Sequence, residues 1–406
     1  MLLDERFRWL LWLSLTEVGT MLVFSNYSAL LPIFQKEWTL TNSQAGWIYS
    51  SYQMGYISAV VVLTSLTDYL PSKSIYLFSA FWSGIAGISF SLFAEGFYSA
   101  LILRTLMGIG FAGTYMPGLR MVSERFPSQE RGLAVGVYVG AFTLGVALSL
   151  FMTGLLNSIL GWKWAFFMTS LGPLGGGCLA FFKLGKATQP QKEMASPISF
   201  KEVLKNRPAL RMILGYAAHM WEMFGMRGWM VAFLTACFLK ANYHLEKAVS
   251  LGAMMIGAIT LGGAFSNTLG GFLSDRYGRA NTIIWMMMSS SFISCLIGWT
   301  IHFPIGLTLT LSVLYGLLVV ADSSSISTGV TELAHPGGLG KTMALQSFLG
   351  WTSASVSPIL FGFILDLTNP PDALITCGYL PNWGWAFLLL GIGGGLGIFA
   401  VWKLKK

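Results

Sequence analysis

Long runs of apolar residues, separated by short polar stretches, repeat along the 406-residue chain. Each run is about 20 residues long, the length that an α-helix needs to cross the hydrocarbon core of a bilayer. The runs are continuous rather than alternating, which disfavours a β-barrel. The pattern predicts twelve membrane-spanning helices, at 9–31, 45–66, 76–94, 98–119, 133–157, 164–182, 208–236, 248–272, 281–301, 304–327, 342–364 and 384–402.

The composition agrees with an all-α membrane protein that crosses the bilayer many times. Hydrophobic residues make up 54% of the chain, charged residues make up 10%, and the mean hydropathy is +0.64. A soluble protein has about 25% charged residues. The first apolar run is longer than the core of a cleaved signal peptide and contains Glu17, so we expect it to be retained as a span.

The net charge of +8 comes from Lys and Arg residues concentrated in a few loops, which indicates membrane topology rather than a nucleic-acid-binding surface. With the twelve spans in place, nineteen Lys and Arg residues lie on the side of the N-terminus. The opposite side holds Lys36, Lys163, Lys240 and Lys247. The positive-inside rule therefore predicts that both termini are cytoplasmic in a bacterial inner membrane.

The longest polar stretch divides the chain into halves of nearly equal size. We expect one six-helix bundle over 1–183, a cytoplasmic linker over 184–207 and a second bundle over 208–406. Ser199 and Glu202 have the spacing of a helix capping box. This spacing favours a short surface helix over 200–205, and the alternative is an ordinary linker.

The two halves repeat one another. Asp68 follows the second span and Asp275 follows the eighth, 207 residues later. Glu124 follows the fourth span and Glu332 follows the tenth, 208 residues later. An internal duplication of this kind is typical of transporters.

The loop after the eighth span reads Gly-x-x-x-Asp-Arg-x-Gly-Arg and resembles the signature loop of the major facilitator superfamily. Its matching residues are Gly271, Asp275, Arg276, Gly278 and Arg279. A degenerate copy after the second span keeps Asp68 and Lys73 but has Thr64 and Pro71 at the glycine positions. In the fourth span, Arg104, Gly108 and Gly110 resemble a second motif of the superfamily that is common in its proton-coupled members.

The resemblance implies two six-helix bundles around a central cavity that opens alternately to each side of the membrane. It also implies that the signature-loop aspartates and basic residues act as cytoplasmic latches, whereas the simpler interpretation is that they only fix topology. Family members that export drugs often carry Gly-Pro in the fifth span. The run from Gly140 to Gly145 lacks that proline, and the glycines there suggest close helix packing at 132, 136, 140 and 145.

Ionisable residues away from the ends of the spans occur in spans one, four, seven and ten, which line the cavity in this superfamily. They are Glu17, Arg104, His219, Glu222, Arg227 and Asp322. A charge at membrane depth costs roughly 2.5–3.5 kcal/mol on insertion scales, so such residues are usually functional. The simpler alternatives are that Arg104 extends to the outer surface and that Asp322 lies near the cytoplasmic mouth.

Two mechanisms remain open for these residues. In the first, Glu17 or Glu222 binds a proton and couples its movement to the rocking of the bundles. In the second, Arg104 and Arg227 bind a carboxylate or another small anion, which a planar guanidinium suits. Polar and aromatic residues that would complete the site, or that only join helices, are Asn26, Tyr27, Gln53, Tyr115, Trp229, Asn267, Gln346 and Trp351.

Span seven also carries a methionine stripe. On a helical wheel, His219, Met223, Met226 and Met230 fall within an arc of about 60°. Soft ligands of this kind suit Cu(I), and the superfamily includes copper importers, so a copper importer is an alternative. Met is also a common apolar filler.

We therefore predict a proton-coupled secondary transporter, a symporter that works by alternating access on a small organic solute, with organic anions among the candidates. The alternatives are the copper importer, a drug/proton antiporter and a membrane protein that does not transport. We expect no enzyme activity, no cofactor and no nucleic-acid partner. No phosphate-binding Gly-x-x-x-x-Gly-Lys loop is present, so no ATP site is expected, and no Cys-x-x-Cys metal-ligand spacing is present. The expected partners are the solute, protons and the lipid bilayer, and the expected state is a monomer.

Overall fold

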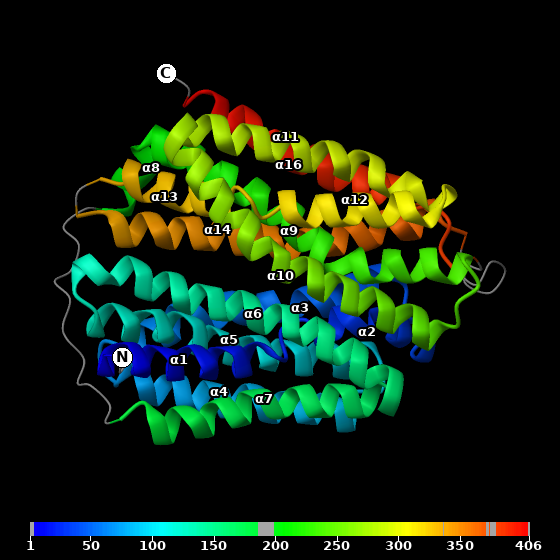
Figure 1. Ribbon diagram of the computed structural model, residues 1–406, viewed down its shortest axis with the longest axis horizontal. Coiled ribbons are helices and arrows are strands. Elements are labelled where there is room, and N and C mark those ends of the chain that lie inside the picture. Colours follow the sequence, from blue (N-terminus) through cyan, green and yellow to red (C-terminus); the bar gives the residue numbers. More distant parts are fainter. Residues whose placement is uncertain (1–3, 186–198, 336, 371–372, 374–378, 405–406) are drawn as a thin grey trace. The chain divides into compact units, whose positions relative to one another are not determined.

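The computed structural model describes residues 4–185, 199–335, 337–370, 373 and 379–404 (Figure 1). Every regular element in these ranges is a helix. The greater part of the predicted linker over 184–207 lies outside the described residues. The prediction of an all-helical protein is confirmed.

The helices of the first half agree with the predicted spans to within a few residues at most of their ends. They are α1 (Glu5–Met21), α2 (Asn26–Glu37), α3 (Asn42–Leu66), α4 (Ser72–Phe93), α5 (Phe97–Arg125), α6 (Ser128–Leu160) and α7 (Trp162–Lys183).

The second half begins with a short helix and continues with the longer ones. Its helices are α8 (Phe200–Lys205), α9 (Arg207–Lys240), α10 (Leu245–Tyr277), α11 (Arg279–Ile297), the 3-10 helix η1 (Gly298–His302), α12 (Ile305–Leu318), α13 (Ser323–Leu333), α14 (Leu339–Thr368) and α16 (Gly384–Trp402). The capping box on α8 is present, because the Ser199 hydroxyl accepts from the Glu202 amide at 3.3 Å while the Glu202 carboxylate accepts from the Ser199 amide at 2.7 Å.

Eleven helical segments in the described ranges are long and apolar enough to cross a membrane. The remaining predicted span is α3, which is 25 residues long and is not among these eleven. Two spans that the sequence predicts as continuous are interrupted, and here the prediction was wrong. Span one breaks between Met21 and Asn26, and span ten breaks between Leu318 and Ser323.

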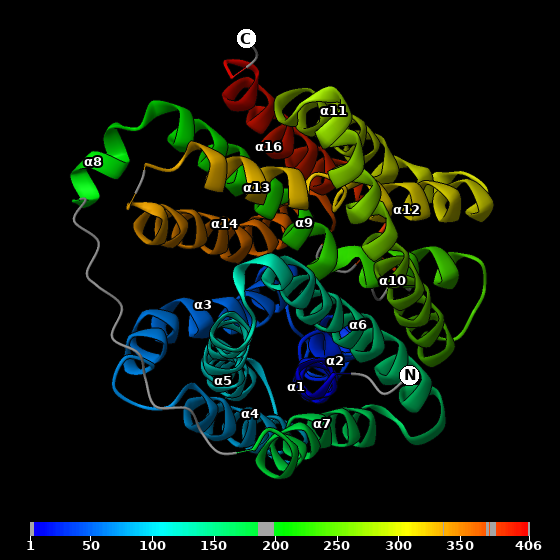
Figure 2. The ribbon, with the colours of Figure 1, turned by 60° about the vertical axis from the view of Figure 1, so that its left-hand side comes forward.

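The described chain groups into two compact units. The first comprises Met1–Thr39, Ser51–Glu193 and Val249–Leu261. In this unit α1 packs against α6 and α7, while α4 packs against α5 and α7. Figure 2 shows α1 among these helices, and its polar residues Ser14, Thr16, Glu17 and Thr20 are buried.

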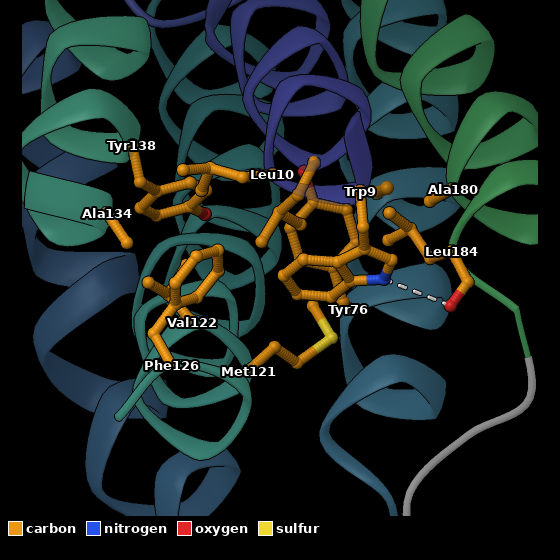
Figure 3. Packing of buried hydrophobic residues seen from close by; sticks show 12 residues of the cluster. Trp9, Leu10, Tyr76, Met121, Val122, Phe126, Ala134, Tyr138, Ala180 and Leu184 are labelled. Carbon is orange, nitrogen blue, oxygen red and sulfur yellow. Dashed lines mark hydrogen bonds between the residues drawn. The ribbon is translucent and has the colours of Figure 1, made fainter. Parts of the chain in front are cut away.

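A buried cluster in the first unit fixes the N-terminal end of α1. Trp9 and Leu10 of α1 pack with Tyr76 of α4 and Tyr138 of α6 (Figure 3). The Trp9 indole donates a hydrogen bond to the Leu184 carbonyl at 3.1 Å. Burial of these large apolar side chains holds the two tyrosine rings beside the central helix.

The second unit comprises Leu40–Ser50, Met194–Ala248 and Gly262–Lys406. Its central helix is α9, which packs against α14, α16 and α13, while α11 packs against α16. Met212, Ile283, Val330 and Leu345 are among the residues of its buried core cluster. Thus α1 and α9, the first spans of the two halves, each occupy the middle of a unit.

Glycines allow close helix packing at some positions and not at others. At Gly145, an added Cβ would lie 2.5 Å from the Met21 Cβ and 2.9 Å from the Val18 carbonyl oxygen, so the predicted close packing is present. At Gly132, Gly136 and Gly140 no atom of the structure lies within 4 Å of an added Cβ, so the prediction was wrong for these three within the described ranges.

Candidate functional site

Arg104 on α5 holds the break in span one. Its guanidinium donates to the Val23 carbonyl at 3.1 Å, to the Phe24 carbonyl at 3.2 Å and to the Asn26 side-chain oxygen at 3.2 Å. The ring of Tyr52 lies 4.5 Å from the guanidinium carbon. Arg104 is fully buried, and its donors meet carbonyl groups that the helix break leaves without helical partners.

The glycines that follow Arg104 position its helix. An added Cβ at Gly108 would overlap the Tyr52 carbonyl oxygen of α3. An added Cβ at Gly110 would lie 2.7 Å from the Ser83 Cβ of α4. The Arg-x-x-x-Gly-x-Gly motif therefore combines an arginine that binds the break with glycines that let α5 approach its neighbours closely.

Glu17 lies on α1 and is fully buried. One oxygen of its carboxyl group accepts from the Tyr138 hydroxyl at 2.7 Å, from Thr20 at 3.2 Å and from Tyr76 at 3.3 Å. Figure 3 labels both tyrosines, which come from different helices. The other oxygen has no hydrogen-bond partner among the described residues, and no cation of the described chain forms an ion pair with this carboxyl group.

Glu222 on α9 has corresponding surroundings in the second unit. It is 1% exposed, and one carboxyl oxygen accepts from the hydroxyl groups of Ser290 and Ser291 on α11, each at 3.2 Å. Gly394 on α16 leaves room for this oxygen, because an added Cβ would overlap it. The second oxygen has no hydrogen-bond partner in the described part of the chain. Glu17 and Glu222 are therefore two hydroxyl-bound carboxyl groups, 205 residues apart in the sequence.

His219 and Asp322 form a buried pair at the break in span ten. The His219 Nδ1 lies 2.8 Å from an Asp322 carboxyl oxygen, and its Nε2 lies 3.0 Å from the Ser323 hydroxyl. Both partners are at most 3% exposed. Asp322 precedes α13 directly, so this pair joins α9 to the interrupted span. Asp322 is thus buried and paired within the described chain.

Arg227 differs from all of these residues. Its side chain is partly exposed, and its guanidinium carbon lies 5.7 Å from the centre of the Phe224 ring. Tyr49 is close enough to interact with it electrostatically. Arg227 forms no ion pair and no hydrogen bond with any residue that the structure describes.

The methionine stripe does not leave His219 free for a metal. Both ring nitrogens of His219 contact oxygen atoms, and a metal ion there would displace one of these contacts. Met223, Met226 and Met230 are buried, with exposures of 8%, 5% and 0%. These contacts favour the interpretation of the three methionines as apolar packing residues.

Several of the secondary candidates have their polar groups bonded within the protein. The Trp229 indole donates to the Pro358 carbonyl at 2.9 Å. Asn267 accepts from the Ser324 amide at 3.0 Å. Asn26 accepts from Arg104, as described above, and its amide donates to Thr169 at 3.4 Å.

The aromatic candidates and Gln53 and Gln346 are also largely buried. Tyr27 stacks on Phe34 with the ring centres 5.4 Å apart, and Tyr115 stacks on Tyr138 at 6.3 Å. Trp351 makes an edge-to-face contact with Phe224 at 5.2 Å. Gln53 and Gln346 are 1% and 7% exposed.

The loop after α3 forms a charged cluster that the sequence predicted only in part. The Asp68 carboxylate lies 2.6 Å from the guanidinium of Arg120, which also binds Glu124 at 2.9 Å. Lys73 instead donates to the carbonyls of Phe181 at 3.1 Å and Gly185 at 2.5 Å. The motif comparison missed Arg120, because this residue comes from α5 rather than from the loop.

The loop after α10 forms the corresponding cluster in the second unit. Arg279 lies 2.5 Å from the Asp275 carboxylate and 3.0 Å from that of Glu332. Gly278 has a φ of 87°, a left-handed conformation that glycine adopts most easily. Arg276 lies over the Tyr277 ring at 5.5 Å, and an added Cβ at Gly271 would lie 3.2 Å from the Ser324 hydroxyl. Both clusters pair an aspartate and a glutamate through one arginine.

The sequence did not predict the hydroxyl groups that bind the carboxyl groups of Glu17 and Glu222. Tyr76, Tyr138, Ser290 and Ser291 bind the two buried carboxyl groups, and none was predicted. The run of three serines at 289–291 in an apolar span was the available signal. The tyrosines lie on helices distant in sequence from Glu17, so no spacing pattern points to them.

Two helical units, each with one interrupted span and with buried ionisable groups, define an integral membrane protein of the transporter class. The family model of the Major Facilitator Superfamily matches residues 13–358. The chain belongs to this superfamily. It is a solute transporter and not an enzyme, as the sequence predicted.

Relatives with transporter names align over most of the chain. The Bacillus subtilis protein called "Hexuronate transporter" is 26% identical, with coverage of 96% of this chain and 92% of that protein. The Cupriavidus necator protein called "Probable sulfoacetate transporter SauU" is 24% identical over 86% of this chain and 84% of its own. The Acinetobacter baylyi "Benzoate transport protein" is 22% identical over 93% and 85%.

Solved structures share the fold. A bacterial homologue of the human lysosomal transporter Spinster superposes with a TM-score of 0.77 at 16% identity, covering 97% of this chain and 95% of that chain. The nucleoside transporter NupG also gives a TM-score of 0.77, at 12% identity, over 98% and 99%. The major facilitator fold is therefore assigned to this chain.

Proposed function

We propose that this protein transports a small organic anion, and that Arg227 binds the anion's acidic group. The observation that carries the proposal is a partly exposed guanidinium in a membrane-spanning helix that forms no ion pair with the described residues. A charge in such a segment is costly, so its presence usually marks a functional site. A guanidinium binds carboxylates and other planar anions through two parallel hydrogen bonds.

The compounds in the names of the relatives support this proposal. Hexuronate, sulfoacetate and benzoate are all small organic anions. They differ widely in size and in polarity, so the shared feature is the acidic group. A single arginine that meets this group would serve each of them.

We further propose that transport is coupled to protons and that Glu17 and Glu222 carry them. Each carboxyl group is buried, has no cationic partner in the described chain and has one oxygen without a hydrogen bond. An unpaired buried charge costs several kcal/mol, and a bound proton removes that charge. Movement of an anion together with a proton also keeps the transported charge small.

The proposed cycle is alternating access between two six-helix bundles, 1–183 and 208–406, joined by the cytoplasmic linker 184–207. Asp68, Lys73, Asp275 and Arg279 are the proposed gating residues at the cytoplasmic ends. We propose that both termini lie in the cytoplasm, because Lys and Arg concentrate on that side. The proposed location is a bacterial inner membrane, and the proposed state is a monomer.

The test is uptake into proteoliposomes containing the purified protein. Labelled glucuronate, sulfoacetate and benzenesulfonate are offered one at a time under an imposed pH gradient, with protein-free liposomes as the blank. At least one anion is expected to accumulate, and Arg227→Ala should lower its uptake at least about 10-fold.

Arg211→Ala is the matched control, because Arg211 lies on the same helix and its one hydrogen bond to a described residue is to the Lys403 carbonyl at 3.3 Å. This variant should retain uptake. The proposal is overturned if none of the three anions accumulates, or if Arg227→Ala transports as well as the unaltered protein. Reversing the pH gradient distinguishes symport from antiport.

A copper importer is not favoured. His219 is hydrogen-bonded to Ser323 and lies 2.8 Å from the Asp322 carboxyl group, and the buried methionines pack within the second unit. The same proteoliposomes, offered Cu(I), provide a direct comparison.

A further inference from the structure

We infer that Asp366 of α14 holds the outer end of the transport pathway closed by binding the first turn of α3, and that this contact opens once in each transport cycle. The inference rests on the alternating access proposed above. It goes further because it names the contact that must break on the side of the membrane opposite the termini. Hydrogen bonds, backbone packing and partial exposure at this contact each support it.

The Asp366 carboxylate accepts four hydrogen bonds from the start of α3. One oxygen accepts from the main-chain amide and from the side-chain amide of Asn42, each at 2.8 Å. The other oxygen accepts from the Ser43 amide at 2.8 Å and from the Ser43 hydroxyl at 2.5 Å. A carboxylate is favoured at a helix N-terminus by the aligned N–H dipoles. We call Asp366, Asn42 and Ser43 the outer latch.

The sequence at the start of α3 leaves these main-chain donors for a partner from elsewhere. Thr41 and Gln44 form a capping box, in which the Thr41 hydroxyl accepts from the Gln44 amide at 3.1 Å and the Gln44 side chain accepts from the Thr41 amide at 3.0 Å. The amides of Asn42 and Ser43 have no acceptor within the helix, because they belong to its first turn. Asp366, which is more than 300 residues away in the sequence, supplies the missing acceptors.

Two glycines bring α3 and α14 together backbone to backbone beside the carboxylate. At Gly46 of α3, an added Cβ would lie 2.5 Å from the Pro358 carbonyl oxygen and 3.1 Å from the Ile359 Cα. At Gly362 of α14, an added Cβ would overlap the Asn42 carbonyl oxygen. Small residues let two helices approach closely. Surfaces without interlocking side chains can also separate and close again without a change of rotamers.

The position of the outer latch allows water to replace its hydrogen bonds. Asp366 and Ser43 are both partly exposed. When the contact opens, the carboxylate and the amides can bind water, so no buried polar group is left without a partner. Arg104 differs, because it is fully buried and its acceptors have no such replacement. The Asp366 contact is therefore suited to reversible opening, whereas the Arg104 contacts are suited to permanent support.

The first test measures opening of the outer end and needs no substrate. Ser50 lies one turn beyond Gly46 on the same face of α3 and is fully buried. A cysteine replaces Ser50 in the full-length protein, whose four native cysteines are replaced by alanine. Intact bacterial cells that express this protein are treated with a membrane-impermeant maleimide, and the rate of labelling is measured.

We expect Asp366→Asn to increase the labelling rate at least about 10-fold, because a neutral amide with one acceptor oxygen cannot replace the carboxylate at four donors. Glu95→Gln is the matched control, because Glu95 is an exposed carboxylate between α4 and α5 on the same proposed side of the membrane. This control should label at the rate of the unaltered latch. Equal labelling of Asp366→Asn and Glu95→Gln overturns the inference.

The second test asks whether the contact must open for transport. Cysteines replace Ser43 and Asp366, whose side chains contact each other, and copper phenanthroline oxidises the two thiols to a disulfide. Uptake of the anion that accumulates in the proteoliposome test is then measured before and after treatment with dithiothreitol. The disulfide should abolish uptake, because a covalently closed contact cannot open. Reduction should restore uptake to the level of Asp366→Cys alone.

The matched control for the disulfide is the pair Asn369→Cys and Asn382→Cys. The Asn382 amide donates to the Asn369 side chain at 2.9 Å, and both residues lie in the second half of the chain near the same end of α14. A disulfide at this pair should leave uptake unchanged, because this contact does not involve α3.

The outcomes separate this inference from the proposed function. Uptake by the disulfide-linked Ser43 and Asp366 pair at the rate of its reduced form overturns the inference and leaves the anion transporter in place. Failure of this pair to form a disulfide where the control pair does so also overturns it. If none of the anions accumulates, the proposed function fails, whereas faster labelling of Asp366→Asn still shows that Asp366 holds the outer end closed.

Discussion

Arg104 and Arg227 are both arginines within membrane-spanning helices. We expect the stability of the fold to depend on Arg104 and not on Arg227. Replacing Arg104 with Met removes the N–H donors of the guanidinium from a fully buried position. Three acceptors are then left: the carbonyls of Val23 and Phe24 and the side-chain oxygen of Asn26. Replacing Arg227 with Met leaves no described acceptor without its partner.

The size of the effect follows from those acceptors. A buried acceptor left without a hydrogen bond costs about 1–3 kcal/mol. Three such acceptors at the lower limit give a loss of about 3 kcal/mol in the free energy of unfolding. In a unit of about 200 residues, each kcal/mol lowers Tm by roughly 2 °C, so Arg104→Met should melt about 6 °C lower.

The assay is thermal unfolding of the two purified variants in the same detergent, followed by tryptophan fluorescence and by loss of monodisperse protein. Arg227→Met should melt within about 2 °C of the unaltered protein, because it removes no protein hydrogen bond. The reasoning is refuted if Arg104→Met melts with the unaltered protein while losing anion binding. That result would make Arg104 a ligand of the substrate rather than a support of the helix break.

Other expected outcomes address the carboxyl groups, the glycines and the pair at span ten. Glu17→Gln and Glu222→Gln should each abolish uptake driven by a pH gradient while leaving exchange of labelled for unlabelled anion, and undiminished proton-driven uptake in both variants would contradict proton coupling at these residues. Gly108→Ala should lower Tm by several degrees, because its Cβ would overlap the Tyr52 carbonyl oxygen. Gly140→Ala should leave Tm unchanged, because the space around its Cβ is open. Equal Tm values for the two variants would refute the packing argument. His219→Ala leaves the buried Asp322 carboxyl group without its partner and should destabilise by about 3–5 kcal/mol, measured by urea or thermal unfolding. Ser323→Ala removes only the hydroxyl contact at 3.0 Å and leaves the Asp322 contact, so it should cost less than half of that, and an equal loss would show that the Asp322 contact is not the main one.

The break in span one could not be predicted from the residues at the break itself. Hydropathy alone predicts a continuous helix over 9–31, because the residues from Leu22 to Ser25 include no proline or glycine. The chain nevertheless leaves the helix there, and Arg104 of α5 binds the exposed carbonyls. The signal for the break therefore lies 80 residues away, on another helix.

Much of the rest was present in the sequence. Apolar runs of membrane length predicted the spans, the repeated Asp and Glu positions predicted two related halves, and the signature loop and the Arg-x-x-x-Gly-x-Gly motif predicted the superfamily. The same reading selected Glu17, Arg104, His219, Glu222, Arg227 and Asp322 as the ionisable residues of the spans. These properties are local, because the free energy of placing a residue in a bilayer depends mainly on that residue and its near neighbours.

Only the tertiary structure decided which of these six residues already has a partner. It bonds Glu17 to tyrosines of α4 and α6 and Glu222 to serines of α11, it places His219 beside Asp322, and it shows Arg227 beside the Phe224 ring with no ion pair among the described residues. Every one of these contacts, apart from the neighbouring ring beside Arg227, joins helices far apart in the chain. A hydrogen bond depends on ångström-scale distances that packing fixes, whereas the sequence specifies which groups enter the membrane and not where their donors and acceptors meet.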